Sequence, residues 1–145
     1  MIGYFDTSAI VPLVIAEPGS ARCAQLWTAC DIRVASMLVV AEAHAALALA
    51  LRIERLTAVE HRSAVALLNR RLNELDLVSP TREIVDLAAE LALSQSLRGY
   101  DAVHAATAVA VRAPDLVVIS GDQALLSAAT GLGLATSDSL ADVRL

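Results

Sequence analysis

The chain has 145 residues, 57% of them hydrophobic, and a formal net charge of −5 at pH 7. This length and composition exclude a disordered or collagen-like chain and predict one domain, which we place at 1–145. All 11 positions that hold Lys or Arg are arginine, so chemistry that needs a lysine, such as a P-loop or a Schiff base, is excluded as well.

The longest apolar stretch, 37–51, contains Glu42 and His44. A membrane-spanning helix needs about 20 apolar residues with few or no charges, so we expect no membrane association. The first residues carry no basic segment followed by an apolar segment of the signal type. A cytoplasmic location is therefore expected.

Short apolar runs alternate with helical patterns along the whole chain. In chain order we expect a strand at 2–5, helices at 7–16 and 20–29, a strand at 32–35, a buried helix at 37–53 and a helix after the capping box of Thr57 and Glu60. We then expect a strand at 77–78, a helix with Ser79 as N-cap and Pro80 as its first residue, a helix at 101–111, a strand at 116–119, a helix at 123–130 and an edge strand at 134–135. Strands separated by helices predict right-handed crossovers, and hence a three-layer α/β fold whose mainly parallel sheet has four or five strands.

Three aspartates lie just after an expected strand or at the start of an expected helix. Asp6 comes directly after the first strand, Asp122 follows the strand at 116–119, and Asp101 opens a helix. Ligands of open α/β sheets bind beyond the carboxyl ends of the strands, so these acids are candidates for one site. Aspartate is also a preferred N-cap, and each of the three, like the hydroxyls of Thr7 and Ser8, could simply cap a helix.

Glu42 lies inside the apolar helix expected at 37–53. An unpaired carboxylate on such a surface is costly, so Glu42 must reach solvent, a partner or a metal ion. The alternative is that an arginine or a backbone donor satisfies it. We expect His44 and His104 to pack or to support ligands rather than to be ligands.

Four converging carboxylates would repel one another, and divalent cations would relieve that repulsion. Oxygen ligands suit Mg²⁺ or Mn²⁺, which can activate water and stabilise the charge on a cleaved phosphodiester. Without these four acids the net charge of the chain is −1, and all 11 arginines remain for phosphates. An acidic chain and a nucleic-acid substrate are therefore compatible.

Four segments together resemble the PIN-domain nucleases, and in particular the small toxin ribonucleases of the VapC type. They are FDTSAIV at the first strand, Glu42 in its apolar helix, LRGYDAVHAATA around Asp101 and ISGDQALLSAA around Asp122. The resemblance spans essentially the whole chain in the same order, with DTSA and YDAVHAA as its specific parts. It identifies the fold as PIN-like.

The resemblance implies a metal-dependent endoribonuclease in which Asp6, Glu42, Asp101 and Asp122 are catalytic and hold Mg²⁺ or Mn²⁺. Hydroxyls of Thr7, Ser8 and Ser120 would support the site. It also implies an RNA substrate, a homodimer and a cognate antitoxin. The protein would contact DNA only through that antitoxin. Gly121 and Gln123 flank Asp122 where a more basic residue often follows in the family.

The alternative function is a catalytically silent PIN fold that acts as a binding or scaffold module. A group of arginines surrounds the expected helical hairpin and could bind phosphate, pair with an antitoxin or face solvent, and we expect most of them to face solvent. These are Arg52, Arg55, Arg62, Arg70 and Arg71.

Overall fold

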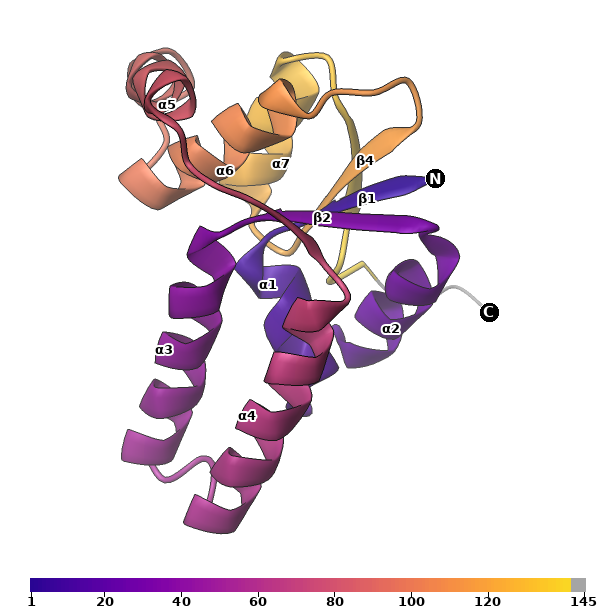
Figure 1. The fold of residues 1–145 in the computed structure, drawn as a ribbon, viewed down its shortest axis with the longest axis vertical. Coiled ribbons are helices and arrows are strands. Elements are labelled where there is room, and N and C mark those ends of the chain that lie inside the picture. Colours follow the sequence, from indigo (N-terminus) through magenta and orange to yellow (C-terminus); the bar gives the residue numbers. More distant parts are fainter. Residues whose placement is uncertain (142–145) are drawn as a thin grey trace.

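The computed structural model describes residues 1–141, and its centre is a sheet of parallel strands (Figure 1). The strand order across this sheet is β3-β2-β1-β4-β5. The strands are β1 (Ile2–Phe5), β2 (Ile32–Ser36), β3 (Asp76–Val78), β4 (Leu116–Ser120) and β5 (Ala135–Asp138). The predicted α/β class with a parallel sheet of four or five strands is confirmed. The expected domain boundary at 145 lies outside the described residues.

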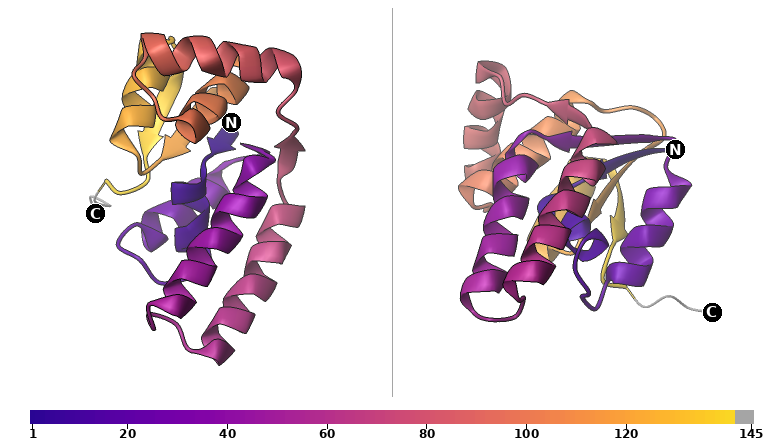
Figure 2. Two further views of the ribbon diagram at one scale, coloured as in Figure 1. Left: turned by 90° about the vertical axis from the view of Figure 1, so that its left-hand side faces the viewer. Right: turned by 60° about the horizontal axis from the view of Figure 1, so that its bottom comes forward.

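Helices cover both faces of the sheet. They are α1 (Thr7–Ile10), the 3₁₀ helix η1 (Val11–Leu13), α2 (Ser20–Ala29), α3 (Leu38–Arg52), α4 (Ala58–Asn73), α5 (Arg82–Ser94), α6 (Gly99–Ala110) and α7 (Gln123–Gly131). The first four α-helices lie on one face, whereas α5, α6 and α7 lie on the other (Figures 1 and 2). None of the helices within residues 1–141 combines the length and the apolar character that crossing a membrane requires.

Neighbouring residues of β1 build the two halves of the core, because successive strand side chains point to opposite faces. Phe5 is fully buried among α1, α2 and α3, and its ring centroid lies 5.0 Å from that of Trp27. Tyr4 is fully buried on the other face, where it packs with β4, α6 and α7. A central strand buried on both faces is the expected position for the apolar run at the start of the chain.

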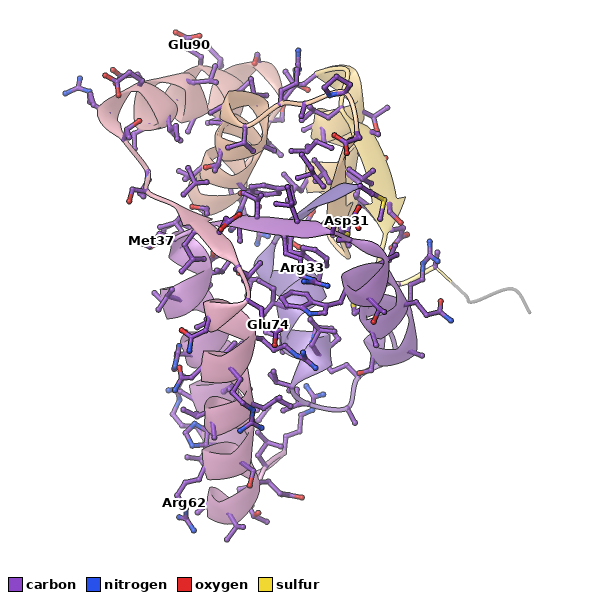
Figure 3. The ribbon with its side chains drawn as sticks, turned by 45° about the vertical axis from the view of Figure 1, so that its right-hand side comes forward. Asp31, Arg33, Met37, Arg62, Glu74 and Glu90 are labelled. Carbon is purple, nitrogen blue, oxygen red and sulfur yellow. The ribbon has the colours of Figure 1, made fainter. Side chains whose placement is uncertain are left out.

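The hairpin of α3 and α4 extends away from the sheet (Figures 1 and 2). Its second helix starts at the predicted capping box: Thr57 accepts a hydrogen bond from the backbone of Glu60, whose side chain accepts one from the backbone of Thr57. Arg62 is exposed near the free end of this hairpin, at the opposite end of the molecule from Glu90 (Figure 3).

The expectation that helix α3 is buried all round is wrong. Val39, Ala43 and Leu47 are buried, but Leu49 is 49% exposed. Helices α4, α1 and η1 cover only one side of α3, so the remaining apolar residues face outward. Hydropathy alone could not distinguish this arrangement from a fully covered helix.

Three helix starts or ends differ from prediction by two residues or more. The first helix ends at Ile10 and continues as 3₁₀ helix, because Pro12 has no N–H to donate to a regular α-helix. Thr81, and not Ser79, caps α5, since its hydroxyl accepts from the backbone of Ile84. Helix α6 begins at Gly99, so Asp101 lies within its first turn and is not its N-cap.

Candidate active site

The strand order places a crevice at the carboxyl ends of β1 and β4. The chain leaves β1 toward β2 on one side and later returns to add β4 on the other side, which makes this point a topological switch. Asp6 follows β1 here, and its backbone N–H donates to Ile119 in β4. The end of β4 carries Ser120, and Asp122 follows two residues later.

Asp6 is a buried carboxylate, with 6% of its surface exposed. Burial raises the pKa of Asp6 from its ordinary value of 3.8 to about 6, although His104 and hydrogen bonds from Ser8 and Ser120 partly oppose that shift. The Ser8 hydroxyl donates to Asp6 Oδ1 at 2.8 Å. A carboxylate that is costly to ionise in its own fold is a strong candidate for a group that binds a cation.

Two serine hydroxyls tie the ends of β1 and β4 together. Ser8 Oγ accepts from the backbone N–H of Gly121 at 2.7 Å and lies 3.3 Å from Ser120 Oγ. Ser120 Oγ in turn accepts from the backbone N–H of Asp122 at 2.9 Å. These contacts fix the position of Asp6 relative to the start of α7.

Glu42 reaches the same edge from helix α3. Its Oε1 accepts hydrogen bonds from Thr7 Oγ1 at 3.1 Å and from His104 Nε2 at 2.7 Å. Burial opposes ionisation of Glu42, but the interactions with His104 and Thr7 outweigh it and lower the pKa of this carboxyl. Glu42 is therefore held as a carboxylate in a defined orientation.

A buried tyrosine orients the histidine that contacts Glu42. Tyr4 Oη lies 3.0 Å from His104 Nδ1, and both residues are almost completely buried. Burial raises the pKa of the Tyr4 hydroxyl, which therefore remains a donor to Nδ1. Nε2 is accordingly the ring nitrogen that donates to Glu42.

Asp101 and Asp122 meet at a single arginine. Asp101 Oδ2 lies 3.0 Å from Arg98 Nε, and Asp122 Oδ2 lies 3.5 Å from Arg98 Nη2. The other oxygen of Asp122 caps α7 by accepting from the backbone of Ala124 and Leu125. Asp122 is thus both a helix cap and a member of the acidic group.

A cavity of about 720 Å³ opens beside these acids. Glu42 and Asp101 line it together with Arg98 and Tyr100, and its remaining wall consists of small apolar residues of α5 and α6. This volume is within the range of small-molecule and cofactor sites. Two partly buried carboxylates therefore adjoin a space that a substrate can enter.

The PIN domain family model matches residues 3–131, which is most of the chain. The chain belongs to the PIN domain family. Ribonuclease VapC45 of Mycobacterium tuberculosis is 39% identical to this PIN domain over 130 residues, which make up 90% of each chain.

Solved structures share the fold of this PIN domain. M. tuberculosis VapC20, described as a toxin that cleaves the sarcin-ricin loop, has a TM-score of 0.69 at 18% identity and covers 92% of this chain and 96% of its own. A toxin–antitoxin complex from Klebsiella pneumoniae has a TM-score of 0.60 at 19% identity, with 83% of this chain and 86% of that one covered.

The PIN domain places the predicted site residues at one edge of its sheet. Hydrogen bonds or ion pairs connect Asp6 to Ser120 through Ser8, Glu42 to Thr7, and Asp101 to Asp122 through Arg98. The alternative that these acids are only caps applies in part. Asp122 does cap a helix, whereas Asp6 makes no side-chain capping bond within residues 1–141 and Asp101 is not at an N-cap position.

The alternative considered for Glu42 is also wrong, because its hydrogen-bond partners are the side chains of Thr7 and His104 rather than an arginine or a backbone donor. The expectation that His104 supports a ligand agrees with this contact. The roles of Arg98 and Tyr4 were not predicted. The only available signal for Arg98 was an arginine three residues before an acid, the spacing of a side-chain pair on a helix.

The donor set suits a magnesium or manganese ion, since all seven predicted side chains offer oxygen. Over residues 1–141, no three His, Cys, Asp or Glu side chains are spaced closely enough to hold an ion together. Arg98 instead pairs with Asp101 and Asp122, and His104 orients Glu42. The oxygen chemistry of these residues therefore fits a divalent cation.

Proposed function

We propose that this PIN domain is a metal-dependent endoribonuclease that cleaves RNA phosphodiester bonds as the toxin of a toxin–antitoxin pair. The observation that carries this proposal is the group of four carboxylates at the topological switch point, beside a cavity that Glu42 and Asp101 line. The ribonuclease name of a relative that is 39% identical over most of both chains supports RNA as the substrate. Because the substrate is cellular RNA, we place the reaction in the cytoplasm.

The proposed roles follow from the contacts of each residue. Asp6, Glu42, Asp101 and Asp122 would hold Mg²⁺ or Mn²⁺, which supplies an activated water and stabilises the charge that develops on the phosphate. Their supporting side chains are Thr7, Ser8, Ser120 and His104.

These supporting side chains hold the carboxylates in position before the substrate binds. Ser8 orients Asp6, and the donors Thr7 and His104 hold one oxygen of Glu42 in place. The other oxygen of Glu42 is left for the cation. Outer partners of this kind commonly change metal affinity or activity about 10–100-fold when removed.

The partners proposed are a cognate antitoxin and a second copy of the chain. The fold shared with a toxin–antitoxin complex supports the antitoxin. In this proposal DNA is contacted only through the antitoxin. An acidic chain with a net charge of −5 has no excess of positive charge with which to bind duplex DNA by itself.

The test compares two aspartates that each pair with an exposed arginine. Asp101 pairs with Arg98 at the site, whereas Asp86 pairs with Arg82 on the outer surface of α5. We expect Asp101→Asn to lower RNA cleavage by orders of magnitude and to reduce the rise in melting temperature on adding Mn²⁺. Asp86→Asn should change neither.

Two results would contradict the proposal. Cleavage by Asp101→Asn that equals the parent would remove Asp101 from the catalytic group. A parent chain that shows neither cleavage nor a Mn²⁺-dependent rise in melting temperature would instead favour the alternative, a catalytically silent PIN fold that acts as a binding module.

A further inference from the structure

One guanidinium bridges the two acids that stand on different helices. Arg98 occupies the N-cap position of α6, directly before the turn that carries Asp101, and Asp122 begins α7. Arg98 reaches Asp101 Oδ2 with Nε at 3.0 Å and Asp122 Oδ2 with Nη2 at 3.5 Å. A single positive charge thus compensates part of the repulsion between two carboxylates.

The exposure of the three partners is unequal. The Arg98 side chain is 83% exposed, whereas Asp101 and Asp122 are 16% and 25% exposed. Ion pairs with exposed arginines contribute little to stability, because water screens the charges and the long side chain loses entropy when it is fixed. The acids are therefore held by the fold, while the guanidinium can leave them at small cost.

The cavity offers the Arg98 guanidinium a second binding partner. Arg98 lines the space that Glu42 and Asp101 also line, and within residues 1–141 it is the one cationic side chain among the lining residues. A guanidinium presents a planar fork of N–H donors that matches a phosphate group. A phosphate bound next to these acids would accordingly form its ion pair with Arg98.

We propose that Arg98 has two alternative partners. In the metal-free chain it neutralises Asp101 and Asp122. When a divalent cation binds these two acids, Arg98 binds the substrate phosphate instead. This inference rests on the metal-dependent cleavage proposed above. The exchange balances charge, since the cation replaces the guanidinium between the two carboxylates and the released guanidinium meets a phosphate anion. Arg98 would then oppose metal binding and favour substrate binding.

The first test measures Mn²⁺ affinity by calorimetry on the intact chain. Arg98→Gln removes the competing charge and should tighten Mn²⁺ binding about two- to tenfold, the range expected for losing one or two exposed ion pairs. Arg82→Gln is the matched control, because Arg82 is also 83% exposed and pairs with an acid on a helix, but outside the site. It should leave the affinity unchanged.

The second test measures cleavage at saturating Mn²⁺, where competition with the cation no longer matters. Arg98→Gln should raise KM for RNA while its metal affinity has improved, and Arg98→Lys should be intermediate because it keeps the charge without the fork. Losing one phosphate contact should also reduce the slope of log KM against log salt by about 0.7. A merely structural role would not change that slope.

The outcomes separate this inference from the proposed function. If the parent binds Mn²⁺ and cleaves RNA but Arg98→Gln binds Mn²⁺ equally or more weakly, the exchange is overturned and the nuclease stands. An unchanged KM and salt slope in Arg98→Gln would likewise overturn it. If the parent binds no Mn²⁺ and cleaves no RNA, both proposals fail.

Discussion

Asp6 links the chemistry of the site to the stability of the fold. Its carboxyl is buried, and its pKa is raised to about 6, so ionising it in the folded chain costs more than ionising it in the unfolded chain. The neutral carboxyl therefore contributes stability that is fully present below pH 3.8 and is lost as pH rises through about 6. A cation at the site would restore that stability at neutral pH.

Replacing Asp6 by asparagine should remove this penalty. In metal-free protein at pH 8, we expect Asp6→Asn to unfold with a free energy up to about 3 kcal/mol higher than that of the parent, which is the difference between pKa values of 3.8 and about 6 converted to energy. The difference should shrink as the pH falls toward 4. Urea unfolding with EDTA at several pH values measures it, and a difference independent of pH would contradict the assigned pKa.

His104 is the residue through which Glu42 is oriented. His104→Ala removes the 2.7 Å hydrogen bond to Glu42 Oε1, and we expect Mn²⁺ affinity or RNA cleavage to fall about 10–100-fold. Tyr4→Phe keeps the buried ring but removes the donor to Nδ1, so it should give a smaller loss of the same kind. Calorimetry with Mn²⁺ and a cleavage assay check both variants. Full Mn²⁺ affinity and cleavage in a folded His104→Ala protein would show that Thr7 alone positions Glu42.

Among the elements, the α3–α4 hairpin supports the site from one side only. Glu42 is near the start of α3, close to the sheet, whereas the connection between the two helices lies at the far end of the molecule. Most of the five arginines expected around the hairpin face solvent, as predicted: Arg52, Arg55, Arg62 and Arg70 are exposed. Arg71 pairs with Glu74. Glu74 also accepts from the indole of Trp27, whose ring lies 5.1 Å from the guanidinium carbon of Arg33 (Figure 3).

The capping box at the start of α4 should therefore affect stability without affecting catalysis. Thr57→Ala removes the acceptor for the Glu60 backbone and should lower the free energy of unfolding by about 1 kcal/mol. RNA cleavage below the melting transition should stay at the parental rate. Circular dichroism melts together with a cleavage assay measure the two quantities, and a loss of activity in the folded variant would connect the hairpin to the reaction.

At the scale of the whole molecule, large apolar side chains remain exposed on or beside several helices. Among them are Leu93 at 87%, Ile53 at 62%, Leu49 at 49% and Val85 at 44% exposed. Large apolar side chains left exposed on a helix are candidates for a site of association. We therefore expect a homodimer, with further apolar surface left for the antitoxin.

Light scattering tests the dimer. We expect the parent at micromolar concentration to have the mass of two chains, and Leu93→Asp to shift the equilibrium toward one chain because a charge would be buried at the contact. Val59→Asp is the control, since Val59 is also exposed, at 63%, but lies on α4. A parent of monomeric mass would rule out the homodimer, and a dimer mass unchanged by Leu93→Asp would exclude α5 as its interface.

Local signals in the sequence determined the order of helices and strands and hence the class of the fold. Helix α2 has the predicted limits, and the capping box of α4 lies at the predicted residues, because both depend on contacts within a few positions of the chain. The strand β5 extends to Asp138 rather than ending at 135, since an edge strand is defined by the neighbour with which it pairs. The pattern of apolar residues also indicated α3, but not which of its sides would be covered.

The sequence by itself also placed Asp6, Glu42, Asp101 and Asp122 among the candidates, because each follows a strand, lies near a helix start or interrupts an apolar pattern. Their partners were decided by the tertiary structure alone. The parallel pairing of β1 with β4 joins Asp6 to Ser120, and the packing of α6 against the sheet brings His104 to Glu42, 62 positions away in the chain. Such contacts depend on which surfaces the folded chain buries together, and a pattern of neighbouring residues does not contain that information.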